Sequence, residues 1–398
     1  MKNKINSIKY EYYLVSLSLT VIDFLFGFAY VAFMSQTGLK NYEIGNVLTL
    51  WSTILLLTGV PFGFLSDKFS PKLMLGLGSL LAGVGYILFG FSKSLSMFLI
   101  SITGVALSNS IISRLPVSWL ISILKQNNRE DEKNSIIPKG ESIAKILTFL
   151  LGILLSTILS NRINNNVYLV NGLLSIFLGL FILMFLSESK SMDEVRNVSF
   201  SYILKSFIIN TTRNRKFSFF CIKFLLFSVA GQIFVYSWQL YSINELGIKS
   251  SYLGMMYSSF LLVLALGYYL ISIFQKYINV FSCIIIGTIT VLVSFFLMYA
   301  FKKDWIFLIS CLIFELGLAL DQGGSLVWIQ SEIDDANRST SLSMLSTIIG
   351  VAGILGTSII TYLLKVSTYN ILWLICSLLV LLSLLLLLLI KNISFRTK

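Results

Sequence analysis

The chain has 398 residues, of which 56% are hydrophobic and only 12% are charged, and its mean hydropathy is +0.86. A soluble protein of this length would carry about twice that share of charge, so the composition excludes a soluble multidomain protein and predicts a polytopic membrane protein. A net charge of +12 is typical of proteins that bind nucleic acids, but the distribution of the basic residues along the chain favours another explanation for this charge.

Twelve apolar stretches follow one another, each near the ~20 residues that a transmembrane helix needs. In order, they cover residues 12–34, 45–65, 73–91, 97–123, 143–160, 167–186, 217–243, 252–274, 277–300, 305–330, 340–364 and 370–390. We therefore expect an all-α integral membrane protein with twelve transmembrane helices. Pro61 and Pro116 are expected to bend the second and the fourth. The first stretch is too long for the apolar part of a cleaved leader, so it is predicted to remain as a helix.

Basic residues are distributed unequally between the two sides of these helices. With the N-terminus inside, the cytoplasmic segments hold 21 Lys and Arg residues and the outer loops hold seven. This bias marks the cytoplasmic side of a membrane protein, so both termini are expected in the cytoplasm. The basicity thus indicates topology, with some attraction to anionic lipid, and no nucleic-acid partner is expected.

The longest polar interruption divides the chain near its middle. It separates six apolar stretches from six, so we expect an N-terminal six-helix bundle at 1–186, a cytoplasmic linker at 187–216 and a C-terminal six-helix bundle at 217–398. Asp67-Lys68-Phe69 after the second stretch falls opposite Gln275-Lys276-Tyr277 after the eighth. The correspondence supports a duplication, and hence two pseudo-symmetric bundles.

Five ionisable side chains lie inside the apolar stretches, more than one helical turn away from their ends. They are Asp23, Arg114, Lys223, Glu315 and Asp321, in the first, fourth, seventh and tenth stretches. Each costs roughly 2.5–3.5 kcal/mol at the centre of a transmembrane helix, and such residues face a bundle interior or a water-filled path. Their recurrence in every third helix predicts one polar cavity that four helices share.

Further polar residues extend this cavity at helical spacing. The candidates are Tyr30 in the first stretch, Gln232, Tyr236 and Gln239 in the seventh, and Gln322 in the tenth. Glu315 and Asp321 point about 120° apart around an ideal helix, so only one of them is expected to face the path directly. We favour Glu315, because Gln322 continues its stripe.

Four of these charges have more than one interpretation. Asp23 and Arg114 form either a coupling pair with a movable carboxylate or a fixed buried ion pair. Lys223 lies near the inner end of its helix, where it either extends to the membrane surface or pairs with an acidic residue of the tenth stretch. Asp321 either shares the path or pairs with a neighbouring helix.

The sequence lacks the residue types that other chemistry needs. There is no histidine, so proton coupling would have to run through carboxylates. The four cysteines lie singly in apolar stretches, without the spacing of a metal site. No clustered catalytic set is visible. We therefore expect no cofactor, no metal and no enzymatic activity.

The loop after the second stretch carries a motif. The residues from Gly63 to Lys72 read Gly-Phe-Leu-Ser-Asp-Lys-Phe-Ser-Pro-Lys. They resemble the loop 2–3 signature of the major facilitator superfamily, Gly-x-Leu-x-Asp-Arg/Lys-x-Gly-Arg/Lys-Arg/Lys, with Ser70 and Pro71 as departures. Before the eleventh stretch, Asn337-Arg338-Ser339-Thr340 resembles the Arg-Ala-Thr entry of bacterial drug-efflux-like members.

The resemblance implies a conformational latch. In the family, the Asp of the motif approaches the start of helix 11 in the outward-open state, where the positive end of a helix attracts a carboxylate. Carried over to this chain, the latch comprises Gly63, Asp67, Lys68, Lys72 and Arg338. The alternative is that Asp67 only closes its own loop and satisfies Lys68.

The resemblance also implies a secondary active transporter whose two bundles rock around a central site. We expect proton-coupled efflux of a small amphipathic solute, with uptake of a nutrient or metabolite as the alternative. A non-transporting receptor or membrane enzyme on this scaffold is a remote one. Two helix patterns of many proton-coupled relatives, Gly-x-x-x-Gly-Pro-x-x-Gly and Arg-x-x-Gln-Gly, are absent. The expected partners are the solute, protons and the lipid bilayer, for a monomer in a bacterial plasma membrane.

Overall fold

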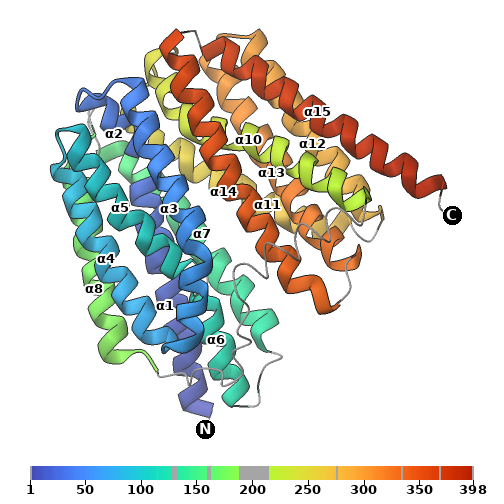
Figure 1. The fold of residues 1–398 in the computed structure, drawn as a ribbon. Coiled ribbons are helices and arrows are strands. Elements are labelled where there is room, and N and C mark those ends of the chain that lie inside the picture. Colours follow the sequence, from blue (N-terminus) through green and yellow to red (C-terminus); the bar gives the residue numbers. More distant parts are fainter. Residues whose placement is uncertain are drawn as a thin grey trace. The chain divides into compact units, whose positions relative to one another are not determined.

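The computed structural model of the chain describes residues 2–113, 115–127, 129, 132–158, 163–187, 215–274, 277–332, 335–366 and 369–396. Every regular element within these ranges is a helix (Figure 1). The all-α prediction is therefore confirmed.

The helices follow the predicted stretches in order. Their bounds are α1 Lys2–Gly27, α2 Tyr30–Gln36, α3 Asn41–Lys68, α4 Pro71–Phe91, α5 Leu95–Ile112, α6 Leu115–Gln126, α7 Lys133–Ile158, α8 Asn166–Phe185, α10 Arg215–Asn244, α11 Leu253–Phe274, α12 Val280–Ala300, α13 Asp304–Glu332, α14 Asp335–Val366 and α15 Tyr369–Arg396, with a 3-10 turn at Ser250–Tyr252. Among the described residues, ten helical stretches are long and apolar enough to cross a membrane. The other two predicted stretches lie in α3 and α14, so every predicted stretch of this multi-pass membrane protein contains a helix among the described residues.

Two predicted spans consist of two helices each. α1 and α2 meet at Ala29, whose φ of −148° and ψ of 6° lie outside the helical region. Near Pro116, where a bend was expected, α5 ends at Ile112 and α6 begins at Leu115, with Arg114 outside the described residues. Proline has no N–H to donate to the carbonyl of Ile112. By contrast, α3 continues through Pro61. Hydropathy did not indicate the break at Ala29, because the chain is equally apolar on both sides of it.

The chain divides into two compact units. Unit 1 comprises Met1–Glu43, Leu50–Asn197 and Lys249–Ser258, and unit 2 comprises Ile44–Thr49, Val198–Ile248 and Ser259–Lys398. Most of the predicted linker lies outside the described residues. The domain boundaries that the sequence indicated therefore stay a prediction.

Glycines bring two helices of unit 1 into close contact. α4 packs on α8 over much of its length, and Gly83 of α4 faces Gly172 of α8. A Cβ atom added to either glycine would lie 2.7 Å from the carbonyl oxygen of the other. Small residues of this kind let the backbones of transmembrane helices approach closely.

An aromatic core lies beside this contact in unit 1. The ring centroids of Phe33 and Tyr168 are 4.7 Å apart, and Phe89 lies 5.0 Å from both Tyr168 and Phe98. Phe26 joins them at 5.1 Å from Phe89. The rings come from α1, α2, α4, α5 and α8, so this core holds most of the unit's helices together.

Unit 2 has a related aromatic core, with Met298 at the position of Phe89. Helices α4 and α12 are both 21 residues long, and aligning them places the starts of α5 and α13 together. This alignment pairs Phe98 with Phe307. In the other helices the sequence offset differs, and the ring contacts themselves pair Phe26 and Phe33 with Phe234 and Tyr241 of α10, and Tyr168 with Trp373 of α15. The centroid of Tyr241 lies 4.8 Å from Phe307 and 5.3 Å from Trp373. Matching contacts at matching positions support the duplication that the loops indicated.

Candidate functional site

Lys223, Asp321 and Thr288 meet in the interior of unit 2. Lys223 of α10 donates to both carboxylate oxygens of Asp321 of α13, at 2.6 Å to Oδ1 and 2.5 Å to Oδ2. Thr288 of α12 donates from its hydroxyl to Oδ2 at 2.6 Å. One carboxylate therefore joins three helices.

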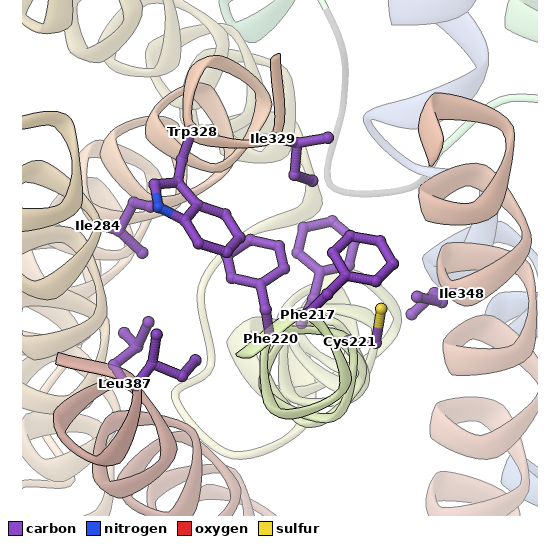
Figure 2. Packing of buried hydrophobic residues seen from close by; sticks show 10 residues of the cluster. Phe217, Phe220, Cys221, Ile284, Trp328, Ile329, Ile348 and Leu387 are labelled. Carbon is purple, nitrogen blue, oxygen red and sulfur yellow. The ribbon is translucent and has the colours of Figure 1, made fainter. Parts of the chain in front are cut away.

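This ion pair is dry, since the exposed fraction of both side chains is 0%. The Lys223 ammonium lies 4.7 Å from the ring centroid of Phe227 and 5.9 Å from that of Phe220. Phe220 packs on Trp328 with centroids 4.4 Å apart. Figure 2 shows these two rings facing each other within an apolar cluster of unit 2. Good geometry and satisfied oxygens are what a buried ion pair requires.

The pair decides between two sequence-based interpretations. Lys223 does not extend to the membrane surface but binds an acidic residue of the tenth predicted span, and Asp321 pairs with neighbouring helices. The matching positions of unit 1 are apolar, because Val15 corresponds to Lys223 and Ile112 to Asp321. The shared frame folds without this charge, so the ion pair is an addition that is specific to unit 2.

Glu315 lies on another side of α13. Its side chain is buried, with 9% exposed, and the matching residue of unit 1 is Ala106. Gln322 lies on the same side of the helix and accepts a hydrogen bond through Oε1 from the Tyr268 hydroxyl of α11 at 3.4 Å. The two acids of the tenth predicted span therefore have different surroundings. That Glu315 faces a transport path stays a prediction.

The polar candidates of α10 lie within the packed frame. Tyr236 and Gln239 are buried, whereas Gln232 is half-buried. In the register of the two units, Tyr236 corresponds to Phe28 and Gln239 to Val31, and both of these are also buried. Polar groups thus stand in unit 2 where unit 1 has apolar ones.

Asp23 is an exposed acid of the predicted set. It lies between one and two turns before the break at Ala29. The carbonyl of Ile22, the preceding residue, accepts a hydrogen bond from Nδ2 of Asn171 at 3.1 Å, which ties α1 to α8. Tyr86 of α4 lies close enough to interact with Asp23 electrostatically. A carboxyl group in an apolar span is thus exposed on the surface of unit 1 next to an interruption of its helix.

Tyr30 lies beyond this interruption, in α2. Its side chain is buried, and its ring stacks on Phe26 at a centroid distance of 5.1 Å and lies 6.0 Å from Trp51. The ring is therefore part of the aromatic surroundings of the break.

Several predicted site residues lie outside the described part of the chain. Arg114 lies outside the described residues. Gly63, Asp67, Lys68 and Arg338 belong to described helices, but the surroundings of these four residues are not described. The Asp23–Arg114 pair and the latch therefore stay predictions. Lys72 is described, and it is half-buried in the first turn of α4.

Sequence reasoning missed Thr288 and Asn171. Both lie in predicted spans that carry no charge, and the search for cavity residues was confined to the four spans with ionisable side chains. A buried Thr or Asn in an apolar helix was the available signal, because such groups need a partner. Among the described side chains, no group of three or more His, Cys, Asp or Glu is placed to hold a metal ion.

A family model described as the Major Facilitator Superfamily matches residues 12–243. The match runs from α1 into the end of α10 and covers more than half of the chain. The chain belongs to the Major Facilitator Superfamily. This confirms the resemblance that the loop motif indicated. No curated protein sequence matches the chain.

Solved structures with the same fold match nearly the whole length of this superfamily member. A mutant of the nucleoside transporter NupG matches with a TM-score of 0.79 at 14% identity, covering 96% of this chain and 99% of NupG. The peptide transporter POT matches with 0.73 at 12% identity, covering 99% and 94%. A bacterial homologue of the human lysosomal transporter Spinster, inward-facing and occupied, matches with 0.69 at 12% identity, covering 97% of each chain. The fold is that of a solute transporter with two six-helix bundles.

Proposed function

We propose that this superfamily member is a secondary active transporter that works by alternating access and couples the movement of a small solute to protons through Asp23. The observation that carries the proposal is the exposed Asp23 carboxyl beside the interruption of its helix at Ala29. Interrupted transmembrane helices are the usual place of substrate and ion sites in transporters.

Exposure of the side chain distinguishes Asp23 from Asp321 as a proton carrier. A coupling group has to take up and release a proton during each cycle, so it must meet water. Asp321 is fully buried and accepts hydrogen bonds from Lys223 and Thr288, so its charge is already compensated. The chain has no histidine, which leaves carboxyl groups for this role.

Efflux of a small amphipathic solute remains our first choice for the direction of transport. It is supported by an acid in the first span, by aromatic residues such as Tyr30 nearby, and by the resemblance of the region around Arg338 to drug-efflux-like members. Uptake is the second candidate, because the matched structures are named as transporters of metabolites, nucleosides in one case and peptides in the other. We place the protein in a bacterial plasma membrane, with both termini in the cytoplasm and a monomer as the working unit.

Everted membrane vesicles with an imposed pH gradient test the first choice. Expression of the protein should drive accumulation of ethidium, an amphipathic cation, and Asp23→Asn should abolish the dependence on the gradient. Asp304→Asn is the matched control, because this exposed acid at the start of α13 accepts a hydrogen bond only from the adjacent N–H of Trp305 among the described contacts. Gradient-driven transport by Asp23→Asn at the wild-type rate would refute coupling through Asp23.

Whole-cell uptake of radiolabelled nucleosides and dipeptides tests the second candidate. The same two variants are compared at pH 6 and pH 8. Uptake that requires Asp23 in cells, together with no ethidium transport in vesicles, would replace efflux by uptake and leave the coupling proposal standing.

A further inference from the structure

Helix α13 has two functionally different faces in unit 2. One face lies against α12, where a Cβ added to Gly317 would be 2.8 Å from the carbonyl oxygen of Gly287. Asp321 shares that face, because its backbone nitrogen lies 2.5 Å from a Cβ added to Gly287. Glu315 and Gln322 lie roughly 100–160° away around the helix. The face with the acid of the predicted path is thus distinct from the face that holds the helix.

Glycine contacts alone do not set the rotation of a helix. They bring backbones together through dispersion, and they supply no interlocking side chain. Hydrogen bonds, in contrast, depend on direction. In unit 1, the Ser108 hydroxyl of α5 donates to the Gly78 carbonyl of α4 at 2.8 Å. The residue of unit 2 at the Ser108 position is Gly317, so α13 cannot make this bond to α12.

We propose that Lys223, Asp321 and Thr288 form an anchor that fixes the rotation of α13 and thereby positions Glu315. Asp321 is then a positioning residue and not a coupling acid. The anchor is a property of unit 2 alone. The use that transport makes of Glu315 rests on the proposed function.

The comparison of the two units supports this assignment. Where unit 2 has Glu315, unit 1 has Ala106, and where unit 2 has the ion pair, unit 1 has Val15 and Ile112. The half without a buried acid at this position also lacks the anchor. The two features occur together in one half, as expected if the anchor serves the acid.

The required precision explains why an anchor is useful. A turn of α13 by about 30° would displace a carboxylate at the roughly 5–6 Å radius of a helix by about 3 Å. Functional groups have to be held within about 0.5 Å of their working position. Three short hydrogen bonds to one carboxylate, from donors on two different helices, hold α13 against both rotation and sliding.

Thr288 offers the sharpest test, because its replacement leaves the ion pair intact. Thr288→Val removes the hydroxyl that binds Asp321 and keeps the shape of the side chain, whereas Thr288→Ser keeps the hydroxyl and serves as the matched control. Cys311 reports on α13: it lies one turn before Glu315 and is 0% exposed. The purified protein is treated with N-ethylmaleimide, and labelling of each native cysteine is measured by mass spectrometry.

The labelling rate of Cys311 should rise by roughly tenfold in Thr288→Val, because α13 then departs from its packed position more often, and it should stay at the wild-type level in Thr288→Ser. Labelling of Cys376, which lies on α15, should not change in either variant. Equal protection of Cys311 in Thr288→Val and wild type would overturn the anchor. A parallel rise at Cys376 would also overturn it, because the effect would then be general loosening of unit 2.

The double variant with Lys223→Val and Asp321→Ile separates anchoring from the mere need to compensate a charge. It introduces the residues that unit 1 has at these positions, so no buried charge is left unpaired. Faster labelling of Cys311 in a folded double variant supports the anchor, and wild-type protection contradicts it. Transport is measured last: a shifted pH profile in Thr288→Val but not in Thr288→Ser links the anchor to Glu315. Faster labelling without any change in transport would retain the anchor and refute a role of Glu315 in transport, and it would leave the proposed coupling through Asp23 untouched.

Discussion

The glycine contact between α4 and α8 yields a stability prediction for Gly83→Ala. In unit 1, the added methyl group would lie 2.5 Å from Cγ1 of Ile176, 2.7 Å from the carbonyl oxygen of Gly172 and 3.0 Å from the backbone nitrogen of Ile176. A side-chain tip can turn away, but two of these three atoms belong to the backbone. The helices therefore have to separate.

The magnitude follows from the distance that the helices must move. Ordinary contact of a Cβ begins at 3.4 Å, so α4 and α8 must part by about 0.7 Å at Gly83. Overpacking of this kind costs about 1–3 kcal/mol. The higher helix propensity of alanine returns about 1 kcal/mol. The net loss of about 0–2 kcal/mol should lower the unfolding midpoint by up to roughly 6 °C, and the midpoint should lie below that of a variant that gains the helix propensity alone.

Thermal unfolding of the purified protein in detergent, followed by intrinsic fluorescence, measures this effect. Gly59→Ala in α3 is the matched control, because nothing lies within 4 Å of a Cβ added there. It should keep or raise the midpoint through helix propensity alone. If Gly83→Ala melts at the same temperature as Gly59→Ala, the close approach of α4 and α8 is not required for stability, and the reasoning from the glycine contact fails.

Three further predictions follow from other contacts. Tyr168→Phe should leave stability unchanged or raise it by up to ~1 kcal/mol, since the buried hydroxyl has no partner among the described residues; a loss beyond that in thermal unfolding would reveal a partner. Lys223→Val or Asp321→Ile alone should cost about 3–5 kcal/mol, whereas the double variant should be nearly neutral; additive losses in the same assay would mean that the pair is not coupled. Asp67→Asn should keep expression and lower turnover, and full transport by this variant would remove Asp67 from the latch.

Hydropathy was enough to predict an all-α membrane fold, because the thickness of the bilayer sets the length of each apolar span. Each span needs a minimum apolar length, so the twelve stretches could be read directly from composition. The interruption at Ala29 could not, because it changes backbone dihedral angles without changing polarity. Pro116 was a visible signal for the separation of α5 from α6, because the missing N–H is a property of the residue itself.

The candidate site was predictable in its residue types but not in its pairings. An ionisable side chain in an apolar span costs free energy and therefore indicates a special environment. Lys223 and Asp321 were both found in this way. Which partner each one takes depends on the rotation of its helix, and the sequence leaves this angle open. Thr288 was missed because a hydroxyl in an apolar helix can bind a backbone carbonyl of the same helix, here that of Ile284. The sequence does not show that this hydroxyl also reaches Asp321.

The differences between the two units carry more information about function than what they share. Both units have related aromatic cores, and both bring the matching helix pair, α4 with α5 and α12 with α13, together through glycine. These features suffice for folding, because unit 1 has Val15 and Ile112 where unit 2 buries a charge pair. A buried ion pair is weak evidence for stability, so its presence in only one of two related halves needs another reason. Holding Glu315 in place is such a reason, and it makes α13 a second helix, beside α1 with Asp23, in which to look for the chemistry of transport.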